Sequence, residues 1–174
     1  YFQATDAAVN TGGYIYVENQ YFQYEEWTRR LVQKRRQVMK LWNKASTGAG
    51  KHLAQMPVLH VFVVIPVPER KEMIPRTYDA LAHLGEQGAM KGQQAMIDRE
   101  NRRMAATKPG SPHSLDGTFG RPQENHRPLP EVVQHANSID KPDPKRLERE
   151  SGIKVCTAML NALADERSST IRLG

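Results

Sequence analysis

The strongest strand signal in this 174-residue chain is the segment VLHVFVVIP, residues 58–66. Apolar residues stand at consecutive positions here, with only His60 breaking the run before Pro66, so the pattern leaves no polar face. Continuous apolar strands of this length are typical of parallel sheets that helices cover on both faces. We therefore predict a central parallel strand at 58–66, and we expect His60 to be a buried, hydrogen-bonded core residue.

An amphipathic helical pattern precedes this strand, from residue 25 to residue 44. Trp27, Leu31, Val38 and Trp42 recur at spacings of four, seven and four residues, which places them on one helix face. Basic side chains surround that apolar face: Arg29, Arg30, Lys34, Arg35, Arg36 and Lys40. We predict a helix that packs on the sheet and keeps these charges in water.

A second strand is predicted further upstream, at residues 14–22, where the sequence is YIYVENQYF. Aromatic and β-branched residues are frequent in its first half, as in most strands. A short helix over residues 1–10 comes before it, and Gly12 and Gly13 separate the two elements.

The chain downstream of residue 66 divides into three parts. A helical tract is predicted from about 76 to 104 with an interruption between 85 and 92, and a third strand is predicted at 152–160. Between them, residues 107–150 contain scattered prolines and little periodicity, which indicates a long loop or a partly disordered insertion. Strands alternating with helices define an α/β fold, with an ordered core at 1–106 and a returning strand within 151–174.

Composition limits the classes of site that the chain can carry. The net charge of +6 would suit nucleic acid, anionic lipid or a phosphate-bearing substrate. Cys156 is the single cysteine, so we exclude an intramolecular disulfide and a cysteine-based zinc site, and we expect a buried structural thiol. No apolar run approaches the roughly 20 residues of a membrane span. Asp98, Glu100 and His113 lack any spacing that specifies a metal, and we assign no metal ligand and no cofactor.

The polar residues Glu18, Asn19 and Gln20 end the strand predicted at 14–22. Ligands of α/β sheets bind at the carboxyl ends of strands, so these side chains are the candidate site. The segment YIYVENQYF is similar to one found between the two catalytic motifs of phospholipase D enzymes. The order of the later elements, including 58–66, the tract IPRTYD at 74–79 and the strand at 152–160, resembles the phospholipase D effectors of bacterial type VI secretion.

The resemblance implies a fold and a chemistry. The family folds as an α/β/α sandwich with a mostly parallel central sheet, and two H-x-K-x4-D motifs supply its catalytic histidines and lysines. The residues two positions after His52, His60, His83, His113, His126 and His135 are Ala, Phe, Gly, Leu, Pro and Asn, so no histidine of this chain fits. The family order puts one motif upstream of Tyr1 and the other beyond Gly174. We therefore carry over no catalytic residue, predict that the isolated chain is inactive, and expect Glu18, Asn19 and Gln20 to brace or line the site.

The implied function is hydrolysis of phospholipid headgroup phosphodiesters without a metal cofactor. As a type VI effector, the parent protein would be made in the cytoplasm, secreted, and active at membranes of a target cell. Its expected partners are a secretion component and an immunity protein. A different class stays open, a non-catalytic basic α/β module that binds nucleic acid or anionic lipid through residues 29–40. A degenerate, inactive homologue is a third possibility.

Overall fold

The computed structural model describes residues 2–48, 56–68, 70–106 and 128–160. Its centre is a three-stranded parallel sheet in the order β1-β2-β3. The strands are β1 (Tyr14–Glu18), β2 (Leu59–Pro66) and β3 (Ile153–Leu160). In the register, Phe62 pairs with Tyr16 on one side and with Cys156 on the other. The prediction of an α/β fold with a central parallel strand near 58–66 is confirmed.

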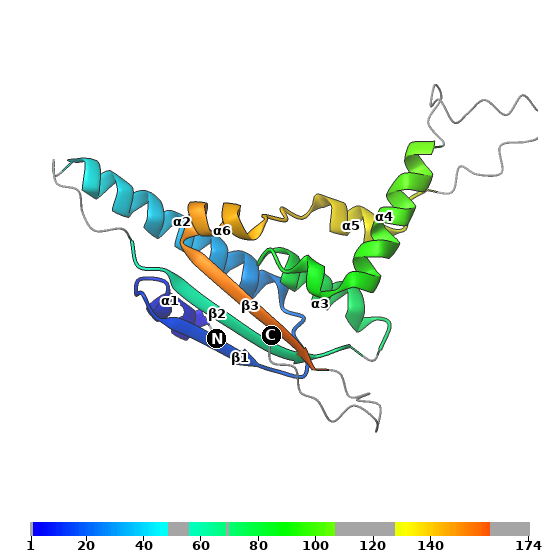
Figure 1. The fold of residues 1–174 in the computed structure, drawn as a ribbon, viewed down its shortest axis with the longest axis horizontal. Coiled ribbons are helices and arrows are strands. Elements are labelled where there is room, and N and C mark those ends of the chain that lie inside the picture. The colour runs from blue at the N-terminus through cyan, green and yellow to red at the C-terminus, as the bar shows by residue number, and fades with distance from the viewer. Residues whose placement is uncertain (1, 49–55, 69, 107–127, 161–174) are drawn as a thin grey trace, which may run out of the picture.

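Helices lie along one side of the sheet in Figure 1, where α2 and α6 run alongside each other and α3, α4 and α5 follow toward the end at which the strands finish. The elements are α1 (Phe2–Ala8), α2 (Glu25–Gly48), α3 (Met73–Ala82), the 3-10 helix η1 (Gln87–Ala89), α4 (Lys91–Ala106), α5 (Glu131–Ser138) and α6 (Pro144–Ser151). Within the described ranges, no helix is both long enough and apolar enough to cross a bilayer.

Two predicted boundaries were wrong. The first strand ends at Glu18 rather than at residue 22, because the Asn19 side chain accepts a hydrogen bond from Tyr21 N (2.9 Å) and so stabilises a turn. The tract predicted as loop or disordered at 107–150 contains α5 and α6, while residues 107–127 lie outside the described residues.

Helix α6 has clear local determinants. Asp143 caps it by accepting a hydrogen bond from the Arg146 backbone N–H (2.9 Å), and Pro144 occupies the first turn, where its missing N–H costs nothing. Gly152 ends it with a φ of +62°, in the left-handed region that favours glycine. Strand β3 begins at the next residue, so this cap sets the point at which the chain enters the sheet.

The hydrophobic core lies between the sheet and the helices. Leu59, Val61, Val63 and Ile65 of β2 are each no more than 1% exposed. They pack with buried side chains of the helices, including Trp27, Leu31, Val32, Tyr78, Leu81, Ile97, Val133 and Leu147. One face of β2 is therefore covered, whereas its apolar sequence predicts that helices cover both.

The other face of β2 is open in the part of the chain that the structure describes. His60 and Phe62 are exposed on it, with their ring centroids 6.3 Å apart in a stacked arrangement, and the neighbouring strand β1 adds exposed Tyr14 and Tyr16. The prediction that His60 is a core residue was wrong. The prediction of a buried Cys156 thiol was also wrong, because Cys156 is exposed on this face. Neither error changes the strand pattern, since His60 alternates with buried neighbours and Cys156 with partly buried ones.

A buried arginine joins the helices to the sheet. Arg35 of α2 is 1% exposed, and its guanidinium donates to four backbone carbonyls. Two of them belong to the loop between α1 and β1 (Val9 at 2.6 Å and Thr11 at 3.3 Å), and the others to Pro57 before β2 and Ser151 before β3 (3.1 Å). Arg35 thus holds together the entries of all three strands, in contrast to the solvated position that was predicted for it.

Candidate functional site

The predicted site residues emerge where β1 ends. Glu18 is the last residue of the strand and is exposed, and its carboxylate accepts a hydrogen bond from the Tyr16 hydroxyl (2.8 Å) on the open face. This hydrogen bond to the carboxylate raises the pKa of Tyr16. Asn19 continues the sheet for one step, since its backbone N–H donates to Val64 O (3.2 Å). Gln20 is exposed in the loop that follows.

A small, mainly aromatic pocket of about 230 Å³ lies beside Asn19. Its lining residues are Val17, Asn19, Tyr21, Phe22, Gln23, Tyr24 and Trp27. Of the three predicted site residues, only Asn19 lines this pocket. Glu18 faces the open side of the sheet, because successive side chains of a strand point to opposite faces. The three residues are thus neighbours in the chain that present their side chains to different surroundings.

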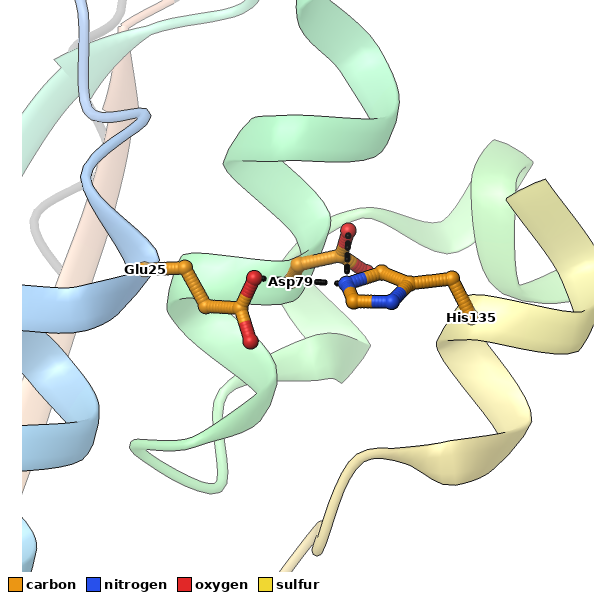
Figure 2. A group of neighbouring side chains, drawn as sticks. All are labelled: Glu25, Asp79 and His135. Carbon is orange, nitrogen blue, oxygen red and sulfur yellow. Dashed lines mark hydrogen bonds and ion pairs between the residues drawn. The ribbon is translucent and has the colours of Figure 1, made fainter. Parts of the chain in front are cut away.

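A second constellation of polar residues was not predicted. Glu25 at the start of α2, Asp79 in α3 and His135 in α5 point toward one another (Figure 2). His135 Nε2 lies 3.3 Å from Glu25 Oε2 and 3.5 Å from Asp79 Oδ2. His83, one residue beyond α3, places its Nε2 2.9 Å from the other oxygen of Glu25. Two carboxylates and two imidazoles therefore meet where three helices approach each other.

The two carboxylates of this constellation differ in their surroundings. Burial raises the pKa of Asp79 to about 6, and the nearby charge of Glu25 adds to that effect while His135, His83 and Lys141 oppose it. Burial also acts to raise the pKa of Glu25, but hydrogen bonds from His83 and His135 outweigh it and the pKa is lowered. The site thus holds one carboxylate that is readily ionised and one that is costly to ionise, which suits it to bind a cation or to exchange a proton.

The sequence offers no spacing signal for this constellation. Glu25 and His83 are 58 residues apart, and Glu25 and His135 are 110 residues apart. The acidic residues that were examined for metal spacing lie elsewhere, on α4, where Asp98 accepts from Gln94 (2.8 Å) and Glu100 pairs with Arg103 (3.0 Å). His113 lies outside the described residues.

The basic residues of α2 are mostly occupied by acidic partners. Arg29 pairs with Glu26 within the helix, and Arg30 and Lys34 both pair with Asp6 of α1. Arg35 is buried, as described above. Lys40 is exposed and has no ion pair with any residue in the described ranges.

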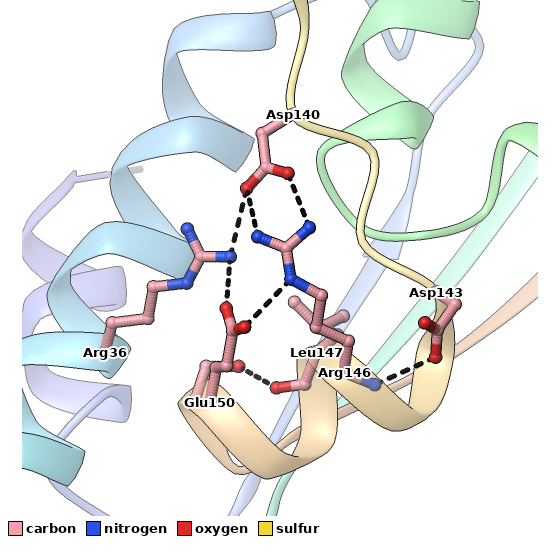
Figure 3. Close-up of polar contacts among 7 residues, drawn as sticks. Arg36, Asp140, Asp143, Arg146, Leu147 and Glu150 are labelled. Atoms are coloured by element: carbon pink, nitrogen blue, oxygen red, sulfur yellow. Dashed lines mark hydrogen bonds and ion pairs between the residues drawn. The ribbon is translucent and has the colours of Figure 1, made fainter.

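Arg36 belongs to a network that fastens α6 to α2 (Figure 3). It lies 3.2 Å from Asp140 and 2.9 Å from Glu150, and Arg146 bridges the same two acids at 3.0 Å and 2.8 Å. Two cations and two anions balance each other, so this part of α2 presents little net positive charge. Most cations of residues 29–40 are therefore already paired, which disfavours the hypothesis of a basic binding surface there.

No family model, curated protein or solved structure significantly matches the chain. The likeness to phospholipase D enzymes consequently rests on the segment 14–22 and on the order of the elements that follow it.

Proposed function

We propose that this chain is part of a phospholipase D-type phosphodiesterase that hydrolyses phospholipid headgroups. The observation that supports the proposal best is the position of YIYVENQYF, residues 14–22, in the sheet. Its first five residues form β1 of a parallel sheet, directly beside the apolar strand β2. Glu18 ends β1 at the carboxyl edge, and Asn19 and Gln20 follow it there. Ligands of open α/β sheets bind at that edge. The full α/β/α sandwich, with helices on both faces, is part of the proposal.

The proposed roles within the site follow from the contacts of each residue. The two H-x-K-x4-D motifs of the parent protein would supply the attacking histidine, the acid–base histidine and the lysines that stabilise the phosphoryl oxygens. Asn19 would brace the site, since it fixes both the last sheet hydrogen bond (Val64 O) and the turn at Tyr21. Glu18 and Gln20 are exposed and would be free to meet substrate or neighbouring parts of the parent enzyme.

The biological setting is proposed from the resemblance to type VI effectors. The parent protein would act on phospholipids of a target cell after secretion, with a secretion component and an immunity protein as partners. Its chemistry would need no metal cofactor, because the phosphoryl group is transferred to histidine and then to water.

The first test is the source gene on both sides of this segment. An H-x-K-x4-D motif upstream of Tyr1 and another downstream of Gly174 are expected, and a gene without them would overturn the proposal. The gene product that contains both motifs should release headgroups from phospholipid vesicles, whereas the 174-residue chain should release none above a mock purification.

Asn19→Ala in the active gene product tests the site residues. Loss of the turn is expected to displace the site and to lower kcat by about tenfold or more, since small misplacements of reacting groups are costly. Asn43→Ala is the matched control, because Asn43 is an exposed residue of α2 away from the carboxyl edge. Equal activities of the two variants would remove Asn19 from the site.

The competing hypothesis, a basic module that binds nucleic acid or anionic lipid, predicts a different result. Binding through phosphate contacts would weaken steeply as salt rises. The ion pairs of Arg29, Arg30, Lys34 and Arg36 disfavour it, because each of these cations already has an anionic partner.

A further inference from the structure

Glu25, Asp79 and His135 have the donor types and spacing of a metal site. One oxygen or nitrogen from each residue can be chosen so that all three lie within 4.8 Å of one another. The distances from His135 Nε2 to the two carboxylate oxygens, 3.3 and 3.5 Å, are close to the separation of about 3.4 Å between adjacent ligands of tetrahedral zinc with bonds of about 2.0–2.1 Å. An ion placed between these three atoms would need little movement of the side chains.

Asp79 supplies an independent observation. Its side chain is 10% exposed and points into the constellation, yet no donor in the described ranges makes a hydrogen bond to its carboxylate, and His135 Nε2 lies 3.5 Å from it. Burying an ionised carboxylate without hydrogen bonds is costly. A bound cation would offset that cost.

His83 and the adjacent surface complete the arrangement. His83 contacts the oxygen of Glu25 that does not face His135, and a hydrogen bond at that position orients a metal-binding carboxylate. An open pocket of about 470 Å³ includes Glu25, His83 and His135 in its lining, and would give water or an anionic ligand access to the remaining coordination position. Three protein ligands and one open position are the pattern of zinc sites that bind an exchangeable ligand.

We propose that Glu25, Asp79 and His135 bind one divalent transition-metal ion, of which Zn²⁺ fits the ligands best, with His83 orienting Glu25. The imidazole favours zinc and its neighbours over Mg²⁺ and Ca²⁺, which prefer sites made of oxygen alone. This site is distinct from Glu18, Asn19 and Gln20, and it does not depend on the proposed phosphodiesterase.

Isothermal titration of the untagged 174-residue chain with Zn²⁺ at pH 8 tests the proposal. One ion should bind per chain, and Ca²⁺ should bind at least about 100-fold more weakly. His135→Ala should weaken Zn²⁺ binding by about 100-fold. His83→Ala should weaken it by about tenfold, as is usual when a residue that orients a metal ligand is removed. His60→Ala is the matched control, since His60 is exposed on the open face of the sheet, and its affinity for Zn²⁺ should equal that of the unmodified chain.

Folding of the variants is checked by circular dichroism. His135 is half exposed, so its replacement should leave the fold intact. Replacement of zinc by Co²⁺ adds a readout, because a tetrahedral site gives visible absorption bands that Asp79→Asn and His135→Ala should abolish. Absence of stoichiometric Zn²⁺ binding, or binding that His60→Ala weakens as much as His135→Ala does, would overturn the proposal. Either result would leave the proposed phosphodiesterase function unaffected.

Discussion

The two faces of the sheet have similar apolar sequences on β2 but very different surroundings. Leu59, Val61, Val63 and Ile65 are buried under the helices, whereas His60 and Phe62, which alternate with them, are exposed. The continuous apolar pattern predicts burial on both faces, and the described residues cover one. A continuous apolar pattern therefore shows that a strand can be buried on both faces, and does not show that it is. Whether a layer covers each face depends on other parts of the chain.

The covered side contains a buried cation, and its loss should have the largest effect on stability. Arg35→Met would leave the carbonyls of Val9, Thr11, Pro57 and Ser151 without their donor, and we expect a loss of about 3–5 kcal/mol in the free energy of unfolding. Urea unfolding followed by circular dichroism measures this loss. The stability of Arg35→Lys should lie between that of the unmodified chain and that of Arg35→Met, because an ammonium group cannot reach all four carbonyls.

Lys40→Met is the control for Arg35. It removes the same charge from the same helix at an exposed position, and the change in stability should be within about 0.5 kcal/mol. If Arg35→Met and Lys40→Met were equally mild, the account of Arg35 as the link between the strand entries would be incorrect.

A pair of leucines tests the two faces directly. Leu59 is fully buried on the covered face, and Leu160 is 53% exposed on the open face. Leu59→Ala should cost about 3 kcal/mol from lost burial and the resulting cavity, and Leu160→Ala less than about 0.5 kcal/mol. Chemical denaturation of both variants measures the difference. Similar costs would indicate that the open face is covered in solution.

Asp79 is the buried charge that lacks the hydrogen bonds that Arg35 has. In metal-free buffer at pH 8, Asp79→Asn should stabilise the chain by about 1 kcal/mol, because it removes a buried ionised carboxylate without removing a hydrogen bond. Thermal unfolding in the presence of a chelator measures this gain, and Asp98→Asn on exposed α4 is the control. A destabilised Asp79→Asn variant would show that the contacts of the carboxylate outweigh the cost of its burial.

Most of the fold could be predicted because its signals are local. The strands near 14, 59 and 153 and the helix α2 follow from runs of β-branched residues and from the spacing of Trp27 and Leu31. Helices α5 and α6 differ from the loop that was predicted there, because scattered prolines are typical of loops. Pro130 and Pro144 instead stand at helix starts, where proline is tolerated, and Asp143 and Gly152 are ordinary capping residues.

The candidate sites differ in how far the sequence could reveal them. Glu18, Asn19 and Gln20 are consecutive, so a strand pattern followed by polar residues is enough to single them out. Glu25, Asp79 and His135 meet only because α2, α3 and α5 pack together, and each is an ordinary polar residue within its own helix. Arg35 was missed for the same reason, since a basic residue beside an amphipathic stripe is usually solvated.

Cys156 gives the smallest and most direct test of the open face. Its thiol is exposed, so a disulfide reagent should label it in the native chain at a rate within about tenfold of that in urea, and Cys156→Ser should change stability by less than about 0.5 kcal/mol. Val155 is its neighbour on β3 and packs against the core from the covered side. A chain with Cys156→Ser and Val155→Cys should therefore be labelled more slowly, because the side chain at position 155 is partly buried against the core. If Cys156 were instead labelled as slowly as the cysteine at position 155, a further layer would have to cover the open face in solution. The two faces of the sheet would then not differ in exposure.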